Sequence, residues 1–163
     1  MDIRSRIKLA GGSLMAMLDS EHGFLPTRGY EVAHDLGRWW DAALRVEEAI
    51  GYVIPAELES ACLKGLHILT DNPDSLLMCA PEINWMAKNA KINPHNFRET
   101  LLAFGGLVRQ RNSRWARESG LNLVRSMDRI LQPDGRMDLT KLCSWGRLPS
   151  TTDPSHTEPM RDG

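Results

Sequence analysis

The sequence has few cysteines, no excess of charge of one sign and no long hydrophobic run, and each absence excludes a class of protein. Its cysteines, Cys62, Cys79 and Cys143, are odd in number and lack CxxC spacing, so we expect neither a disulfide framework nor a structural zinc site. The 20 basic and 21 acidic side chains disfavour nucleic acid and anionic membranes as partners. Charge interrupts the apolar residues near the amino terminus, so we expect no signal peptide. Together these features favour a cytoplasmic protein with reduced cysteines.

The signature motifs of several enzyme classes are also missing. The chain contains no HExxH, no GxSxG, no P-loop and no dinucleotide-binding GxGxxG in its strand context. We therefore expect no metal and no cofactor. With 163 residues, of which 42% are hydrophobic and 25% charged, the chain has the composition of a single globular domain.

Apolar residues recur at helical spacing in five segments, which predicts an all-α fold. The predicted helices cover approximately residues 3–18, 34–50, 55–69, 96–111 and 113–131. Gly51 is a natural stop for the second helix, Pro55 fits the first turn of the third, and Ser113 is a plausible cap of the fifth. Residues 19–33 and most of 74–94 are expected to be loops.

Short connections between the predicted helices favour antiparallel packing, so we predict two helical hairpins. The second and third helices form one hairpin, and the fourth and fifth form the other. Residues 1–143 would then be a helical-hairpin domain. Residues 144–163 are rich in Pro, Ser and Thr and are expected to be an extended loop or a truncated linker.

Several predicted helices carry expectations about which side chains face inward. The residues that share one face of the third helix are Leu58, Ala61, Cys62, Gly65, Leu66 and Leu69. The inward residues of the fourth helix are Phe97, Leu101, Phe104, Leu107 and Val108. In the first helix, the residues of one stripe are Ile3, Ile7, Ala10, Leu14 and Leu18. In the fifth helix, the inward residues are Trp115, Val124, Met127 and Leu131.

Residues 30–41, where the first long loop meets the second helix, form the densest cluster of chemically active side chains. Helical spacing places Asp35, Arg38 and Trp39 within about one turn of each other. Aromatic rings stack on sugars, while carboxylate and guanidinium groups bond hydroxyls, so a carbohydrate pocket is one interpretation. In the other interpretation Trp39 and Trp40 are core residues, Asp35 caps the helix and Arg38 pairs with it.

A second cluster precedes and begins the fourth helix. Glu82 could act as an acid or base, and His95 could assist it. In the alternative interpretation His95 or Asn96 caps the helix, while Arg98 and Glu99 are solvated.

Two stretches of sequence resemble a known family. LDSEHGFLP at positions 18–26 and AHDLGRWWDAA at positions 33–43 are similar to the N-terminal part of α/α-toroid glycoside-hydrolase-like proteins, such as the β-L-arabinofuranosidase-type families. In such proteins an Asp-rich, Pro-containing loop precedes a helix that faces the toroid centre. The resemblance covers mainly residues 1–131 and implies antiparallel hairpins forming part of an (α/α)6 toroid.

The resemblance implies that the chain hydrolyses a glycosidic bond or binds a glycan, with a carbohydrate as its ligand. It leaves open whether this chain is itself an enzyme. A glycosidase needs two suitably separated carboxylates, and we nominate Asp35 and Glu82 as catalytic candidates. The candidate substrate-binding residues are His34, Arg38, Trp39, Trp40 and His95.

Chain length sets a limit on this interpretation. A complete toroid of twelve helices requires roughly 300 residues, because helices average about 12 residues. The chain has 163 residues and five predicted helices, which is fewer than a complete toroid requires. We therefore expect a fragment with a missing C-terminal portion, a truncated relative, or a chain that completes its core by self-association.

The competing interpretation is a non-catalytic helical scaffold that binds another protein through an exposed surface. The two interpretations differ in what they expect of the tryptophans. A glycan site predicts that Trp39 or Trp40 is partly accessible beside Asp35 and Arg38. A scaffold predicts that both rings are buried and that apolar surface is exposed elsewhere.

Overall fold

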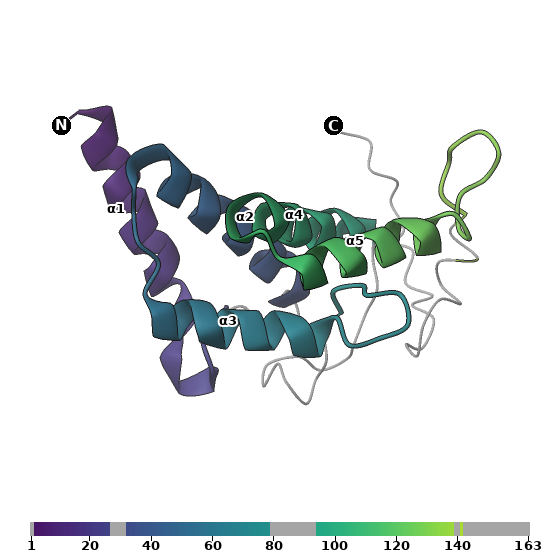
Figure 1. The fold of residues 1–163 in the computed structure, drawn as a ribbon, viewed down its shortest axis with the longest axis horizontal. Coiled ribbons are helices and arrows are strands. Elements are labelled where there is room, and N and C mark those ends of the chain that lie inside the picture. The colour runs from purple at the N-terminus through teal and green to yellow at the C-terminus, as the bar shows by residue number, and fades with distance from the viewer. Residues whose placement is uncertain (1, 27–31, 79–93, 139–140, 142–163) are drawn as a thin grey trace, which may run out of the picture.

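The structure is a computed structural model, and it describes residues 2–26, 32–78, 94–138 and 141 (Figure 1). Helices account for most of these residues, which confirms the predicted all-α fold class. The helices are α1 (Ile3–Ala16), α2 (Val32–Ile50), α3 (Ala56–Leu69), α4 (Pro94–Arg111) and α5 (Arg114–Met127). Two short antiparallel strands, β1 (Leu18–Asp19) and β2 (Leu25–Pro26), flank the 3-10 turn η1 (Ser20–His22). The predicted segment 144–163 lies outside the described residues.

Local sequence signals explain where several helices begin and end. The Ser113 hydroxyl accepts a hydrogen bond from the Ala116 amide, as an N-cap side chain does, and Pro55 directly precedes α3. Gly51 ends α2 with a positive φ of 68°, a conformation that glycine adopts at little cost. These three predicted signals are confirmed.

The most extensive helix contact joins α2 to α4, which run parallel to each other. Gly37 lies against Glu99 near the amino ends of the two helices, Gly106 lies against Leu44, and the Gln110 side chain donates to Glu48 near the carboxyl ends. Because the contacting positions advance together along both helices, their amino ends lie at the same end of the molecule.

The remaining helices complete the core around this pair. α5 follows α4 after two residues and returns antiparallel to it, with Phe104 packed edge-on against Trp115. α3 runs beside α5 (Figure 1), and the ring centroids of His67 and Trp115 lie 3.6 Å apart. The main core cluster combines side chains of α2, α3 and α4, and a smaller one forms around Phe97 and Leu123.

The structure corrects the predicted face of α1. The helix ends at Ala16, so Leu18 lies in β1, and Ile3 is 76% exposed. The buried residue of α1 is Gly11, where a Cβ atom would lie 3.0 Å from Val46 and 3.2 Å from Tyr52. Leu14 of the predicted stripe does pack against the core, as does Met15 beside it, so these two side chains and the close approach at Gly11 together fix how α1 lies.

The predicted extent and face of α5 are also wrong in part. The helix ends at Met127, so Leu131 lies beyond it, and Val124 is about half-exposed. The fully buried residues Ala116 and Leu123 occupy the inward face instead. Gly120 lies on the same face, against Phe104 of α4. In the predicted loop 19–33, the short β1–β2 hairpin forms and α2 begins at Val32.

Candidate functional site

The sequence-predicted site residues that the structure describes gather at the amino ends of α2 and α4. Asp35 lies in the first turn of α2 and is half-buried, and His95 lies in the first turn of α4 and is also half-buried. His34 belongs to α2, but its side chain lies outside the described part. Glu82 lies outside the described residues altogether, so the nominated pair of carboxylates stays a prediction.

Both tryptophans of this region are core residues. Trp39 is 4% exposed and Trp40 is 0% exposed, and their rings meet edge to face at 5.1 Å. The Trp39 indole N–H donates to the Leu14 carbonyl at 3.1 Å and so connects α2 to α1. Among the described residues, the buried indole N–H of Trp40 has no acceptor. In this arrangement neither ring offers an open face on which a sugar could stack.

Arg38 belongs to an ion cluster that also contains Arg98 and Glu99. Glu99 is fully buried, and its Oε1 accepts from Arg38 Nε at 3.0 Å and from Arg98 Nη2 at 2.7 Å. The prediction that Glu99 is solvated is therefore wrong. Both arginine side chains remain roughly half-exposed, so each guanidinium bridges a buried carboxylate and the surface.

The position of Glu99 follows from a close contact between backbones. A Cβ atom on Gly37 would lie 2.3 Å from the Glu99 carbonyl oxygen, so only glycine permits this approach of α2 to α4. The contact buries the Glu99 carboxylate between α2 and α4, in the second turn of α4. Glu99 Oε2 has no hydrogen-bond partner among the described residues.

Glu99 could have been found from the sequence. It lies four residues before Ala103 and eight before Leu107, both buried, so the three share one stripe of α4. Leu107 of this stripe was predicted to face inward together with Phe97, Leu101, Phe104 and Val108, whereas Glu99 was expected to be solvated. Gly37 packs against the Glu99 backbone.

A second ion cluster joins the carboxyl ends of α2 and α4 to the amino end of α3. Arg111 donates to both Glu47 carboxylate oxygens at 2.6 and 2.8 Å, and to Glu59 at 2.6 Å. The hydrogen bonds from Arg111 lower the pKa of Glu47, and the two carboxylates raise the pKa of Arg111. Every charge here is engaged by another, so the cluster holds the three helices together.

Other chemically active groups give little support for catalysis. Burial raises the pKa of the Cys62 thiol to about 12, which makes it a poor nucleophile. In the described ranges, no three His, Cys, Asp or Glu side chains are grouped as metal ligands would be. The helices of the same ranges include none that is long and apolar enough to cross a bilayer.

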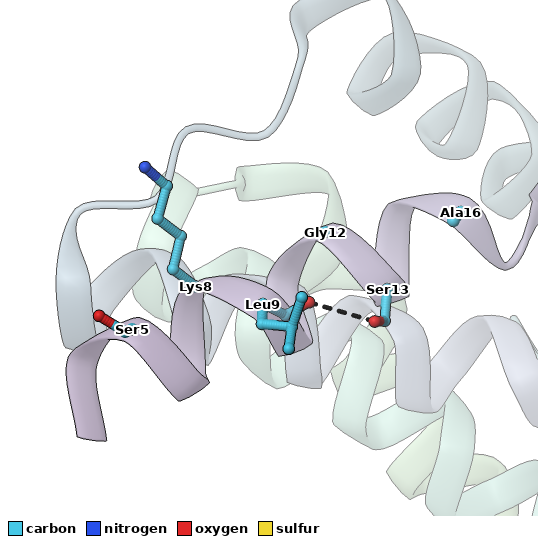
Figure 2. Close-up of a pocket in the computed structure, with 6 residues that line it drawn as sticks. All are labelled: Ser5, Lys8, Leu9, Gly12, Ser13 and Ala16. Carbon is cyan, nitrogen blue, oxygen red and sulfur yellow. Dashed lines mark hydrogen bonds between the residues drawn. The ribbon is translucent and has the colours of Figure 1, made fainter. Parts of the chain in front are cut away.

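A shallow groove of about 570 Å³ lies along the outer side of α1 (Figure 2). Its lining residues are Ser5, Lys8, Leu9, Gly12, Ser13 and Ala16. Leu9 is the one large aliphatic side chain of this lining. Nothing among the described residues lies within 4 Å of where a Cβ of Gly12 would be. This surface was not anticipated from the sequence.

Compared with protein-family models, curated proteins and solved structures, the chain shows no match to any of them. The resemblance to toroid glycoside-hydrolase-like proteins therefore stays a prediction.

Proposed function

We propose that this protein is a non-catalytic helical scaffold that binds another protein. The observation that carries the proposal is the contrast between its aromatic and aliphatic side chains. Trp39 and Trp40, the residues best suited to hold a sugar, are buried in the core, whereas several large aliphatic residues are exposed on helix surfaces. On the helices these residues are Ile3, Leu9, Ile68, Leu121 and Val124, and the exposed Met17 and Val53 lie just outside helices.

The location of the exposed aliphatic residues supports this interpretation. Leu9 lies on α1, and Leu121 and Val124 lie on the outer side of α5, so the chain has two separate apolar helix surfaces. Single exposed aliphatic residues are common, but helix faces that carry them are typical docking sites for partner helices. Stacked helical units often use such faces to bind proteins.

Site-specific photocrosslinking tests the proposal. A photoreactive residue is placed at Leu9, at Leu121 and, as a control, at the exposed polar position Lys64 of α3. The chain is then irradiated in an extract of its native cells. We expect one protein to crosslink at an apolar position and not at Lys64, and to bind the purified chain in a titration. If no protein crosslinks above the Lys64 control, the scaffold proposal fails.

A carbohydrate-active function is the second candidate, and the Arg38–Glu99–Arg98 cluster is the observation that favours it. The two half-exposed guanidinium groups lie at the helix end that also holds Asp35 and His34, and such groups can bond sugar hydroxyls. Calorimetric titration with plant and microbial oligosaccharides tests it. Saturable binding that Arg38→Met abolishes would support this candidate, and no heat with any sugar would exclude it.

A further inference from the structure

We propose that the outer face of α1 is a docking site for an acidic amphipathic helix of a partner protein. The inference rests on the proposed scaffold function and names the surface and the chemistry of the partner. Three features of α1 carry it: its shape, its unpaired positive charge and the small size of its outward side chains.

The orientation of α1 leaves a surface of small side chains open to a partner helix. Gly11 packs closely against Val46 and Tyr52, which turns Gly12 and Ala16 outward. Leu9 stands beside them and is 65% exposed (Figure 2). Small side chains let two helix backbones come close, and a single large apolar residue then inserts between side chains of the partner.

The charged side chains of α1 are all positive. The helix contains Arg4, Arg6 and Lys8 and no Asp or Glu, and the Asp2 carboxylate before it is bonded to the Ser5 amide and hydroxyl. Within the part of the chain that the structure describes, no carboxylate forms an ion pair with Arg6 or Lys8.

By contrast, most arginines of α2, α4 and α5 have such a partner, among them Arg38, Arg98, Arg111 and Arg114. Carboxylates on both sides of an apolar stripe would therefore complement α1.

Two other occupants fit this face less well. A helix that lies on a membrane surface needs bulky apolar residues, whereas this face carries Ser5, Gly12, Ser13 and Ala16 around one leucine. A second copy of α1 would bring further arginines and lysine and no carboxylate of its own helix. An acidic helix satisfies both the shape and the charge.

The test is a selection on the full chain from a displayed library of helical peptides with randomised charge. We expect the enriched peptides to carry an apolar stripe flanked by Glu or Asp. Their affinity should fall with added salt and at least about tenfold in Leu9→Glu, because a carboxylate there repels the peptide. Leu121→Glu is the matched control, since Leu121 is a 52% exposed leucine on α5, and it should leave affinity unchanged.

A second variant guards against a folding defect. Gly12→Gln fills the groove without adding charge and places a better helix former in α1, so it should also weaken binding at least about tenfold while the chain keeps its helical circular dichroism. Neutral or basic peptides, or peptides that bind Leu9→Glu unchanged, would overturn the inference. The inference would also be overturned if the chain bound anionic phosphatidylserine vesicles through Leu9, or dimerised through Leu9, in place of binding acidic peptides.

Failure here and failure of the scaffold proposal are distinguishable. If a partner protein crosslinks at Leu121 but not at Leu9, the docking site is wrong and the scaffold function stands. If no partner protein crosslinks at either position, the scaffold function itself fails.

Discussion

The α2–α4 contact and the outer face of α1 use similar residues in opposite ways. In the contact, Gly37 lets two backbones approach so closely that no Cβ atom fits, and Arg38 and Arg98 beside it are paired with Glu99. On α1, a Cβ atom on Gly12 would have no neighbour within 4 Å, and Arg6 and Lys8 lack ion pairs among the described residues. Glycine and positive charge stabilise the fold in the first region, whereas in the second they remain available to a partner.

Replacing the two glycines tests this contrast and should give the largest effect. Gly37→Ala places a methyl group 2.3 Å from the Glu99 carbonyl oxygen and should lower the free energy of unfolding by about 3 kcal/mol or more. Gly12→Ala meets open space in a helix and should raise it by about 0.5–1 kcal/mol. Urea unfolding followed by circular dichroism measures both. Equal stability of the two variants would remove the distinction between the regions.

The arginines provide the next comparison. Arg111→Met leaves Glu47 and Glu59 without their cation at a partly buried position and should cost about 2 kcal/mol, between the values for surface and buried pairs. Arg6→Met removes a charge that has no ion pair among the described residues and should change stability by less than about 0.5 kcal/mol. Thermal unfolding at matched pH measures the difference. A similar loss in both variants would mean that α1 contributes ion pairs of its own.

Acid unfolding should show where the cluster around Arg111 acts. The pKa of Glu47 is lower in the folded chain than its ordinary value of 4.5, so its stabilisation is present above that value. It is lost as the pH falls through the lowered pKa. Glu47→Gln should therefore be less stable than the natural chain near neutral pH by about 1 kcal/mol, and the gap should close as the pH falls through the lowered pKa of Glu47. A gap that is constant from neutral to acidic pH would contradict this assignment.

The smallest effect is expected at Leu9. Leu9→Glu lies on an exposed surface and should change the free energy of unfolding by less than about 0.5 kcal/mol. The same substitution is expected to weaken peptide binding at least about tenfold. Urea midpoints compared with those of Leu121→Glu provide the check. A large loss of stability would show that Leu9 contributes to folding rather than to a free surface.

The sequence predicted best those elements whose local signals agree with one another. In α3, Pro55 marks the start, and Leu58, Cys62 and Leu66 recur at helical spacing and are buried as expected. In α5 the apolar residues lie at adjacent positions, so Leu123 and Val124 compete for the inward face. Packing between helices decides which is buried: Leu123 joins Phe97 of α4 in the smaller core cluster, and Val124 is exposed.

The candidate site was predicted only in part, because its main contact is not local. Arg38 was identified as a site residue, but its partner Glu99 lies 61 positions later in the chain. No spacing rule links Gly37 to the Glu99 carbonyl; a parallel α2–α4 pair is needed first. Trp39 and Trp40 were named as either pocket or core, and a single sequence could not choose between them, since an aromatic pair suits both.

The attachment of α1 has a further consequence for hydrogen exchange. α1 is held by Gly11, by the Trp39 indole bond to Leu14 and by a bond from Arg4 to the Ile50 carbonyl, whereas α2 is surrounded by core side chains. An element with few buried contacts opens at a lower free energy than the rest of the fold. The backbone amides of α1 should thus exchange with deuterium before those of α2. A helix bound to its outer face would slow that exchange, so the same amides would report occupancy.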